Sequence, residues 1–297
     1  MNVKEYADEL AKVVEHVLEK KVTVVKMSKV DTDSYGICVE SDKDVEMTFN
    51  VTPLYEHKIC VMEAVCIILE TCMNIELEES KHIDWIKDFD NIKDRLYFKV
   101  VNKSANANYI EKYVCNSHLD LLKVYCIMAK VKNGIHSIEI KKEYLDAWGI
   151  TEQTLMELAE SNSKNLLPCA IVNYTDCKKM VEQKDLRCLP TDLKYDRVNG
   201  VGKDSKWILS NKYMFEGASS MFYKDILRDF AKTYESDILI VPTSVHEVVI
   251  VPVSEVSDIN EIRMLQKDNK ENTPVEQFLS DNLYIYSRER EQIEFLE

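Results

Sequence analysis

Two apolar runs in the last third of the chain constrain the fold more than any other part of the sequence. The runs, DILIVP at residues 237–242 and HEVVIVP at residues 246–252, are apolar at nearly every position, and each ends in proline. A short run of this kind is typical of a strand that is buried on both faces of a sheet. Because only Thr243, Ser244 and Val245 lie between the runs, we predict a tight antiparallel hairpin at the centre of a hydrophobic core.

A second hairpin is predicted around Asn133 and Gly134, which separate the apolar runs 121–131 and 135–141. Asn-Gly between two apolar runs favours a two-residue turn, because both turn positions need a positive φ. Other short runs rich in β-branched and aromatic residues predict further strands. They lie at residues 22–27, 35–40, 45–50, 95–102 and 283–287, and the runs 207–211 and 217–223 suggest a third hairpin.

Amphipathic helices are interspersed with these strands. Apolar residues recur every three or four positions over residues 3–18 and again over residues 223–234, which places them on one face of a helix. A Thr-Pro pair predicts the start of a helix over residues 52–79. Further helices are expected after Thr151, which is a good cap residue, and over residues 255–267.

Strands and helices follow one another without strict β-α-β alternation, which favours the α+β class, with largely antiparallel sheets and packed helices. The length of 297 residues suggests about two domains of ordinary size. The chain changes character near Trp148 and Gly149, where the glycine can close a short helix. We therefore expect two subdomains, residues 1–148 and residues 149–297.

Charge and cysteine content bound the class of protein. The 52 Asp and Glu exceed the 38 Lys and Arg, and the resulting net charge of −14 opposes binding to phosphate backbones and to anionic membrane surfaces. Nine cysteines without a pairing pattern, together with the lack of a signal peptide and of a long apolar run, favour a cytoplasmic protein that does not span a membrane. Nucleic acid is not an expected partner; another protein or a second copy of the chain is.

The last third of the chain also carries a distinctive combination of motifs. DILIVPTSVHEVVIVP at residues 237–252 and PVEQFLSDNLYIYSRERE at residues 274–291 resemble the signature of an uncharacterised bacterial family. That signature is an aspartate-led strand, a Pro-Ser-Ser turn, a His-Glu strand and a Leu-Ser-Asp strand. The chain departs from it at Thr243 in the turn and over residues 211–216. Similar segments at residues 88–102, 146–155 and 158–168 extend the resemblance over nearly the whole chain. The resemblance implies a common fold and a bacterial cytoplasmic origin, and no activity.

Two familiar site patterns fail in this sequence. The run GVGKDS at residues 200–205 is not a phosphate-binding loop, because Arg197 stands where the first glycine should be and Asp204 replaces the hydroxyl residue that would hold magnesium. The sequence contains no Cys-x-x-Cys and no His-Glu-x-x-His pattern, and Cys115 and His118, whose spacing suits a metal, lack a second ligand pair. We expect neither a bound cofactor nor a metal site.

His246 and Glu247 are the strongest candidates for functional residues. They open a predicted strand directly after a turn of small and hydroxyl residues, where polar side chains can face a ligand. Strand alternation directs the two side chains to opposite faces of the sheet, so partners from elsewhere would be needed. Ser219 and Asp281 are the candidate partners. The alternative is a structural role, in which His246 or Glu247 ties the turn by hydrogen bonds.

Three functional hypotheses follow. Since every catalytic motif fails, the first is a non-catalytic binding or interaction protein, with a protein partner or as a homo-oligomer. The second is a hydrolase or transferase with a site near His246 and Glu247, for which His246 should be accessible, bonded to a carboxylate and near a hydroxyl. The third is an acidic mimic of nucleic acid, which requires one continuous negative stripe on the surface. The sequence alone identifies no biochemical activity.

Overall fold

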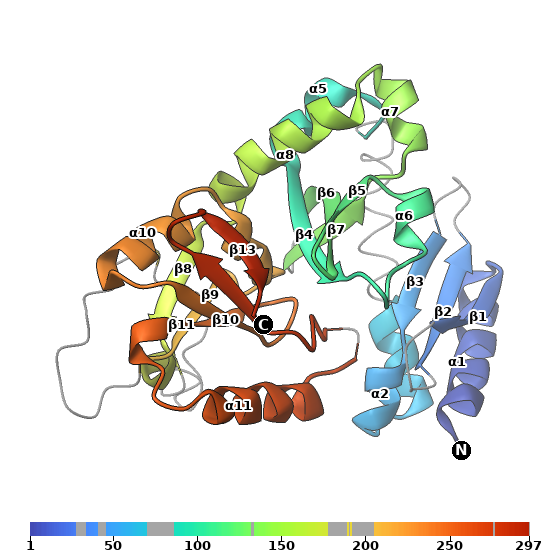
Figure 1. Cartoon of the computed structure of the whole chain (residues 1–297). Helices are drawn as coiled ribbons and strands as arrows, with labels where there is room; N and C mark the ends of the chain where they lie inside the picture. The colour runs from blue at the N-terminus through green and yellow to red at the C-terminus, as the bar shows by residue number, and fades with distance from the viewer. Residues whose placement is uncertain are drawn as a thin grey trace. The chain divides into compact units, whose positions relative to one another are not determined.

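This computed structural model of the protein describes residues 1–27, 34–40, 46–69, 86–131, 134–177, 189, 191, 205–275 and 277–296. They divide into two units, Met1–Trp85 and Ile86–Glu297, whose elements are labelled in Figure 1. Helices are mixed with strands, and each strand pairing among the described residues is antiparallel, so the predicted α+β class is confirmed. The expected division into residues 1–148 and 149–297 stays a prediction; its boundary falls within the second unit.

The first unit is a helix packed on a three-stranded meander, as the sequence predicts. Helix α1 (Val3–Leu18) begins with a capping box, in which the side chains of Asn2 and Glu5 each accept a hydrogen bond from the backbone N–H of the other. Its apolar face, which includes Tyr6 and Leu10, is buried in the core of this unit. The strands are β1 (Val22–Met27), β2 (Ser34–Glu40) and β3 (Glu46–Asn50), paired in that order.

The helix predicted over residues 52–79 is not continuous. Helix α2 (Thr52–Glu56) ends near Lys58, whose left-handed backbone has a φ of 57°, and a second helix covers residues 61–69. A left-handed residue with a side chain cannot continue a right-handed helix, so the chain must restart after it. Residues 70–85 lie outside the described part of the chain.

The second unit contains two sheets. In the first sheet, the long strand β6 pairs with β4 along one edge and with β5 and then β7 along the other. The pairing of β6 with β7 confirms the predicted second hairpin, although residues 132–133 of its turn lie outside the described residues. The strands are β4 (Leu96–Asn102), β5 (Cys115–His118), β6 (Leu121–Val131) and β7 (Gly134–Glu139).

Helices surround this first sheet. Gly149 ends α7 with a left-handed φ of 66°, and Thr151 caps α8 by accepting a hydrogen bond of 3.1 Å from the backbone N–H of Thr154, as their positions in the sequence predict. Helix α8 packs across β4 (Figure 1), and its Ser163 hydroxyl accepts from the backbone N–H of Phe98. The helices are α5 (Phe89–Ile92), η1 (Lys93–Arg95), α6 (Tyr109–Lys112), α7 (Glu143–Trp148) and α8 (Glu152–Leu166).

The second sheet has the strand order β13-β12-β10-β11-β9-β8. Its two central strands, β10 (Ile238–Pro242) and β11 (Val248–Pro252), are buried at every position, which confirms the predicted hairpin. Helix α11 (Ile259–Asn272) packs on one face through Ile262, and α10 (Ile226–Tyr234) packs on the other, where Phe230 meets the Trp207 ring edge-on. The remaining elements are β8 (Cys169–Asn173), β9 (Trp207–Asn211), η2 (Gly217–Phe222), η3 (Val253–Glu255), β12 (Tyr284–Ser287), β13 (Gln292–Phe295) and a short helix over residues 174–177.

The hairpin predicted from residues 207–211 and 217–223 is wrong. The first run forms β9, which pairs with β8 and β11, but most of the second forms the 3-10 helix η2. Glu216 has a left-handed φ of 51° and turns the chain before η2. Gly217 then lies so close to β9 that a Cβ atom there would overlap the Ser210 hydroxyl. Close packing, which local composition does not reveal, decides the conformation of this segment.

Candidate functional site

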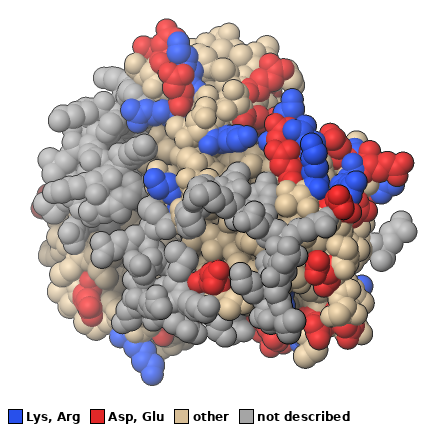
Figure 2. Space-filling model, turned by 90° about the vertical axis from the view of Figure 1, so that its left-hand side faces the viewer, with Lys and Arg blue, Asp and Glu red and all other residues tan. Residues whose placement is uncertain are grey.

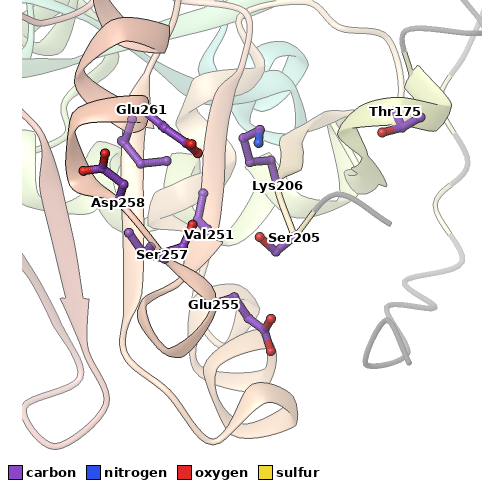
Figure 3. Close-up of a pocket in the computed structure, with 10 residues that line it drawn as sticks. Thr175, Ser205, Lys206, Val251, Glu255, Ser257, Asp258 and Glu261 are labelled. Atoms are coloured by element: carbon purple, nitrogen blue, oxygen red, sulfur yellow. The ribbon is translucent and has the colours of Figure 1, made fainter. Parts of the chain in front are cut away.

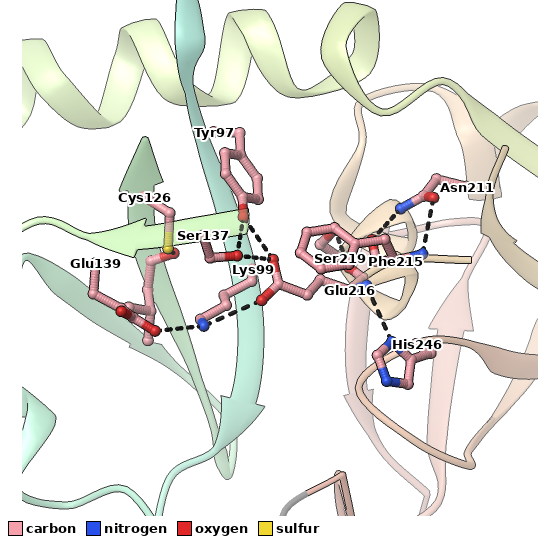
Figure 4. Close-up of polar contacts among 11 residues, drawn as sticks. Tyr97, Lys99, Cys126, Ser137, Glu139, Asn211, Phe215, Glu216, Ser219 and His246 are labelled. Carbon is pink, nitrogen blue, oxygen red and sulfur yellow. Dashed lines mark hydrogen bonds and ion pairs between the residues drawn. The ribbon is translucent and has the colours of Figure 1, made fainter. Parts of the chain in front are cut away.

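Strand alternation and cross-strand pairing gather ionisable side chains on one face of the first sheet of the second unit. Tyr97 of β4 lies opposite Cys126 of β6, which lies opposite Glu139 of β7. Lys99 and Ser137 each lie two positions along a strand from a member of this row, so they share its face. We call these residues, together with one glutamate from the second sheet's side, the ionic cluster (Figure 4).

Glu216, which directly precedes η2, is that glutamate. Its Oε1 lies 3.1 Å from Nζ of Lys99, and its Oε2 accepts hydrogen bonds of 2.7 Å from the hydroxyls of Tyr97 and Ser137. Lys99 also pairs with Glu139 at 2.7 Å. Because the side chains of Lys99 and Glu216 are only 13% and 12% exposed, solvent screens their attraction little.

Charge pairing and burial set the protonation states in the ionic cluster. Burial alone would lower the pKa of the Lys99 ammonium, but the carboxylates of Glu216 and Glu139 outweigh burial and hold that pKa well above its usual value. Burial raises the pKa of the Cys126 thiol well above its usual value and raises the pKa of the Tyr97 hydroxyl as well. At neutral pH the cluster therefore contains a cationic lysine, a neutral thiol and a neutral phenol, which are poor bases and poor nucleophiles.

The backbone of Glu216 is held by two residues that the sequence singles out. The N–H of Glu216 donates to Nδ1 of His246 at 3.2 Å, and the Ser219 hydroxyl donates to the Glu216 carbonyl at 2.9 Å. The Asn211 side chain bonds both backbone groups of the preceding residue, Phe215. These bonds keep Glu216 in its left-handed conformation, which costs about 1–3 kcal/mol for a residue other than glycine.

His246 and Glu247 themselves lie in the connection before β11 and not in the strand. The ring of His246 accepts a backbone N–H, and within the described ranges it is bonded to no carboxylate. Glu247 accepts hydrogen bonds from the Thr243 hydroxyl at its carbonyl, at 2.6 Å, and at its Oε1, at 3.3 Å. Both residues therefore tie the connection between β10 and β11.

Asp281 lies apart from these residues, in an exposed ion pair of 2.7 Å with Lys270. Its neighbour Ser280 is buried and donates to the carboxylate of Asp120 at 2.6 Å, and the Tyr284 hydroxyl donates to the other oxygen at 2.6 Å. The Leu-Ser-Asp motif thus joins the approach to β12 to the turn before β6. The structure does not bring the four candidate residues into one acid–base site; it brings His246 and Ser219 to the backbone of Glu216.

Sequence reasoning missed Lys99, Glu139 and Glu216, which carry the charges of the ionic cluster. A signal existed for Lys99, because a lysine inside the apolar run 95–102 needs a buried partner. Glu216 gave no such signal, since it lies between two predicted strands and its side chain is directed inward only by the turn.

The ionic cluster leaves its members little capacity for further chemistry. Lys99 is bonded to two carboxylates, and Glu216 accepts from three donors. Among the described residues, no group of three or more His, Cys, Asp or Glu side chains could hold a metal ion. Residues 200–204, most of the rejected phosphate-loop pattern, lie outside the described residues.

A pocket of about 510 Å³ lies elsewhere in the second unit, and we call it the His118 pocket. Nε2 of His118 is buried and has no hydrogen-bond partner in the part of the chain that the structure describes. Asp225 at its rim has a left-handed φ of 80°, a strained conformation of the kind that clusters at functional sites. Its apolar walls include Met221, Phe222, Leu227 and Ile293.

A second pocket, of about 460 Å³, lies beside the start of α11 (Figure 3). The exposed carboxylate of Glu261 points toward Lys206, while those of Asp258 and Glu255 point away from it. Asp258 is committed to the helix, because it accepts the N–H of Asn260 at 2.8 Å. None of the unpaired buried polar atoms in the described residues belongs to this lining, so water can satisfy its groups.

The surface carries charges of both signs. On the face shown in Figure 2, Lys and Arg side chains lie beside Asp and Glu side chains, and the described residues of this face do not form the continuous negative stripe that a nucleic-acid mimic requires. None of the helices in the described ranges has both the length and the apolar character that crossing a bilayer needs.

Comparison with known proteins supplies a relationship but no activity. A family model matches residues 3–288, nearly the whole chain, and its description is a family of unknown function. The match confirms the resemblance noted in the sequence. No curated protein and no solved structure is significantly similar to the chain. Function must therefore be argued from the geometry of the ionic cluster and of the His118 pocket.

Proposed function

The chain belongs to DUF5688, a family of unknown function, and from that premise we propose that it is a non-catalytic protein that binds a small ligand in the His118 pocket. The observation that carries the proposal is the contrast between the two sites. The ionisable groups of the ionic cluster are paired with one another, whereas the His118 pocket contains a buried polar atom without a partner among the described residues.

The ionic cluster suits a structural role better than a catalytic one. A general base or nucleophile must be within reach of a reacting atom and in a reactive protonation state. Lys99 is held cationic, and the Glu216 carboxylate is surrounded by three donors. His246 accepts a backbone N–H on Nδ1 and so positions a loop instead of activating a hydroxyl.

The His118 pocket suits ligand binding. Ligand pockets are usually about 300–1,000 Å³ in volume and combine apolar walls with a few placed polar groups. The volume of about 510 Å³ falls in this range, and the walls are mainly apolar. An unpaired buried polar atom costs about 1–3 kcal/mol, so a ligand that bonds it gains affinity.

The proposed cellular location and partner are those expected from the sequence. The described cysteines are free thiols, which is typical of a reducing compartment, and we propose a bacterial cytoplasmic location on that basis and on the family resemblance. The proposal includes a partner: the ligand-bound protein binds another protein or a second copy of the chain.

The proposal is tested with three small probes, phenol, toluene and benzoate, titrated into the full chain and followed by ligand-observed NMR. At least one probe should bind, and the Ile293→Trp variant, which fills the pocket, should abolish that binding. The matched control is Ser257→Trp, which fills the pocket beside α11 and should leave binding unchanged. Melting curves establish that both variants fold, and Phe222→Ala, which removes a wall, replaces Ile293→Trp if that variant does not.

Two results would overturn the proposal. One is that no probe binds, or that binding is indifferent to changes in the His118 pocket. The other is turnover of p-nitrophenyl acetate or p-nitrophenyl phosphate that is lost in Glu216→Gln or in a His246 variant, because such a loss would make the ionic cluster catalytic.

A further inference from the structure

The geometry around His118 narrows the class of ligand, and this step rests on the proposed function. His118 is the last residue of β5, and its imidazole meets the Phe222 ring edge-on, with centroids 4.8 Å apart and planes at 78°. Nε2 has no hydrogen-bond partner in the described chain, whereas Nδ1 is not among the buried polar atoms that lack one. The neutral ring therefore carries its proton on Nδ1, where the N–H can be satisfied. Nε2 then presents a lone pair.

The imidazole is neutral at physiological pH. Burial lowers the pKa of His118 below its usual value, Lys123 lowers it further, and only the backbone of Ile293 opposes them. Lys123 does not supply the missing donor, because its ammonium pairs with Glu160 at 3.2 Å and lies over the Phe222 ring at 4.8 Å. Nε2 is therefore a buried acceptor without a donor from the described residues.

The rest of the pocket favours an uncharged, largely apolar body. Arg228 at the rim pairs with Asp225 at 2.7 Å, and Lys224 and Glu291 add one charge of each sign. The rim therefore gives no preference for an anion or a cation. The walls below it are aliphatic and aromatic.

We infer that the His118 pocket selects neutral ligands in which an apolar ring-sized body carries a hydrogen-bond donor, with the donor directed at Nε2 of His118. A ligand of the same shape without the donor leaves Nε2 unpaired, and a carboxylate places a second acceptor against it. A site that hydrogen-bonds one ligand group discriminates against analogues that lack the group, because its own polar atom is then left unsatisfied.

The same three probes test this inference, because they differ in the group that would meet Nε2. Phenol carries a donor, toluene has none, and benzoate carries an anion. Phenol should bind the full chain about two- to tenfold more tightly than toluene, the range expected for one neutral hydrogen bond, and more tightly than benzoate. His118→Phe keeps the ring contact with Phe222 and removes the acceptor, so phenol and toluene should then bind equally. Ser257→Ala, in the other pocket, is the control and should leave the ratio unchanged.

The outcomes separate the inference from the proposed function. If phenol and toluene bind equally to the wild type, the inference is wrong while the pocket remains a binding site; if no probe binds, both are wrong. A phenol preference that survives in His118→Phe also overturns the inference. If His118→Phe does not fold, the ¹⁵N shifts of labelled histidine in the wild type decide. A proton on Nε2 overturns the inference, and an unprotonated Nε2 whose shift responds to phenol supports it.

Discussion

Replacing Glu216 with glutamine should lower the free energy of unfolding of the second unit by about 3 kcal/mol, because a buried ion pair loses one charge. Removing one partner of a buried pair costs about 3–5 kcal/mol. The lower end applies here, since Lys99 keeps Glu139 at 2.7 Å and the glutamine oxygen can still accept from Tyr97 or Ser137. Lys99→Met should cost more, about 4 kcal/mol, because it leaves two carboxylates facing each other without a cation.

A double-mutant cycle isolates the interaction itself. Lys99→Met with Glu216→Gln should cost about 5 kcal/mol, which is less than the two single costs together and gives a coupling of about 2 kcal/mol. Urea unfolding is followed by circular dichroism and by tryptophan fluorescence, since two of the three tryptophans, Trp148 and Trp207, lie in the second unit. The control cycle uses Lys270 and Asp281, whose side chains are 52% and 63% exposed and should couple by less than about 1 kcal/mol. Additive costs for Lys99 and Glu216 would refute the reasoning.

Three further predictions test other parts of the second unit. Gly217→Ala should cost more than about 3 kcal/mol by urea unfolding, because a Cβ there overlaps β9 and the His246 carbonyl, and a near-neutral effect would contradict the packing. His246→Ala should cost about 1–3 kcal/mol by the same assay, since the N–H of Glu216 loses its acceptor; a loss below about 0.5 kcal/mol would contradict the structural role. The lowered pKa of His118 means that the unfolded chain takes up a proton near pH 6.5 before the folded protein does. The contribution of His118 to the free energy of unfolding is therefore fully present above about pH 6.5. It is lost as the pH falls through the pKa that His118 has in the folded protein. His118→Phe should flatten the stability–pH profile there, and an unchanged profile would contradict the assignment.

The predictable parts of the fold are those with local signals. The hairpin of β10 and β11 followed from two short apolar runs, and that of β6 and β7 from an Asn-Gly pair. Caps such as Thr151 followed from residue type. The conformation of residues 217–223 could not be predicted from local signals, because it depends on how closely Gly217 approaches β9.

The sites were less predictable than the fold for the same reason. Lys99 could be suspected from its place in an apolar strand, but its partner lies far along the chain; Tyr97 and Glu216, which meet in the same cluster, are 119 positions apart. His118 attracted attention only for its spacing from Cys115. The feature that matters, an acceptor nitrogen without a donor, depends on β13 and on η2, which the sequence places more than a hundred residues away.

The ionic cluster also has a consequence for how the family can diverge. The backbone at Glu216 is left-handed, a conformation that glycine or asparagine would adopt with less strain, yet either replacement would remove one of the two carboxylates that pair with Lys99. A relative that relaxes the backbone at this position must therefore leave its lysine with Glu139 alone, or lose or re-pair that lysine. The residues at positions 99 and 216 should therefore covary across the family, and the residues at positions 97 and 137 should change together with them.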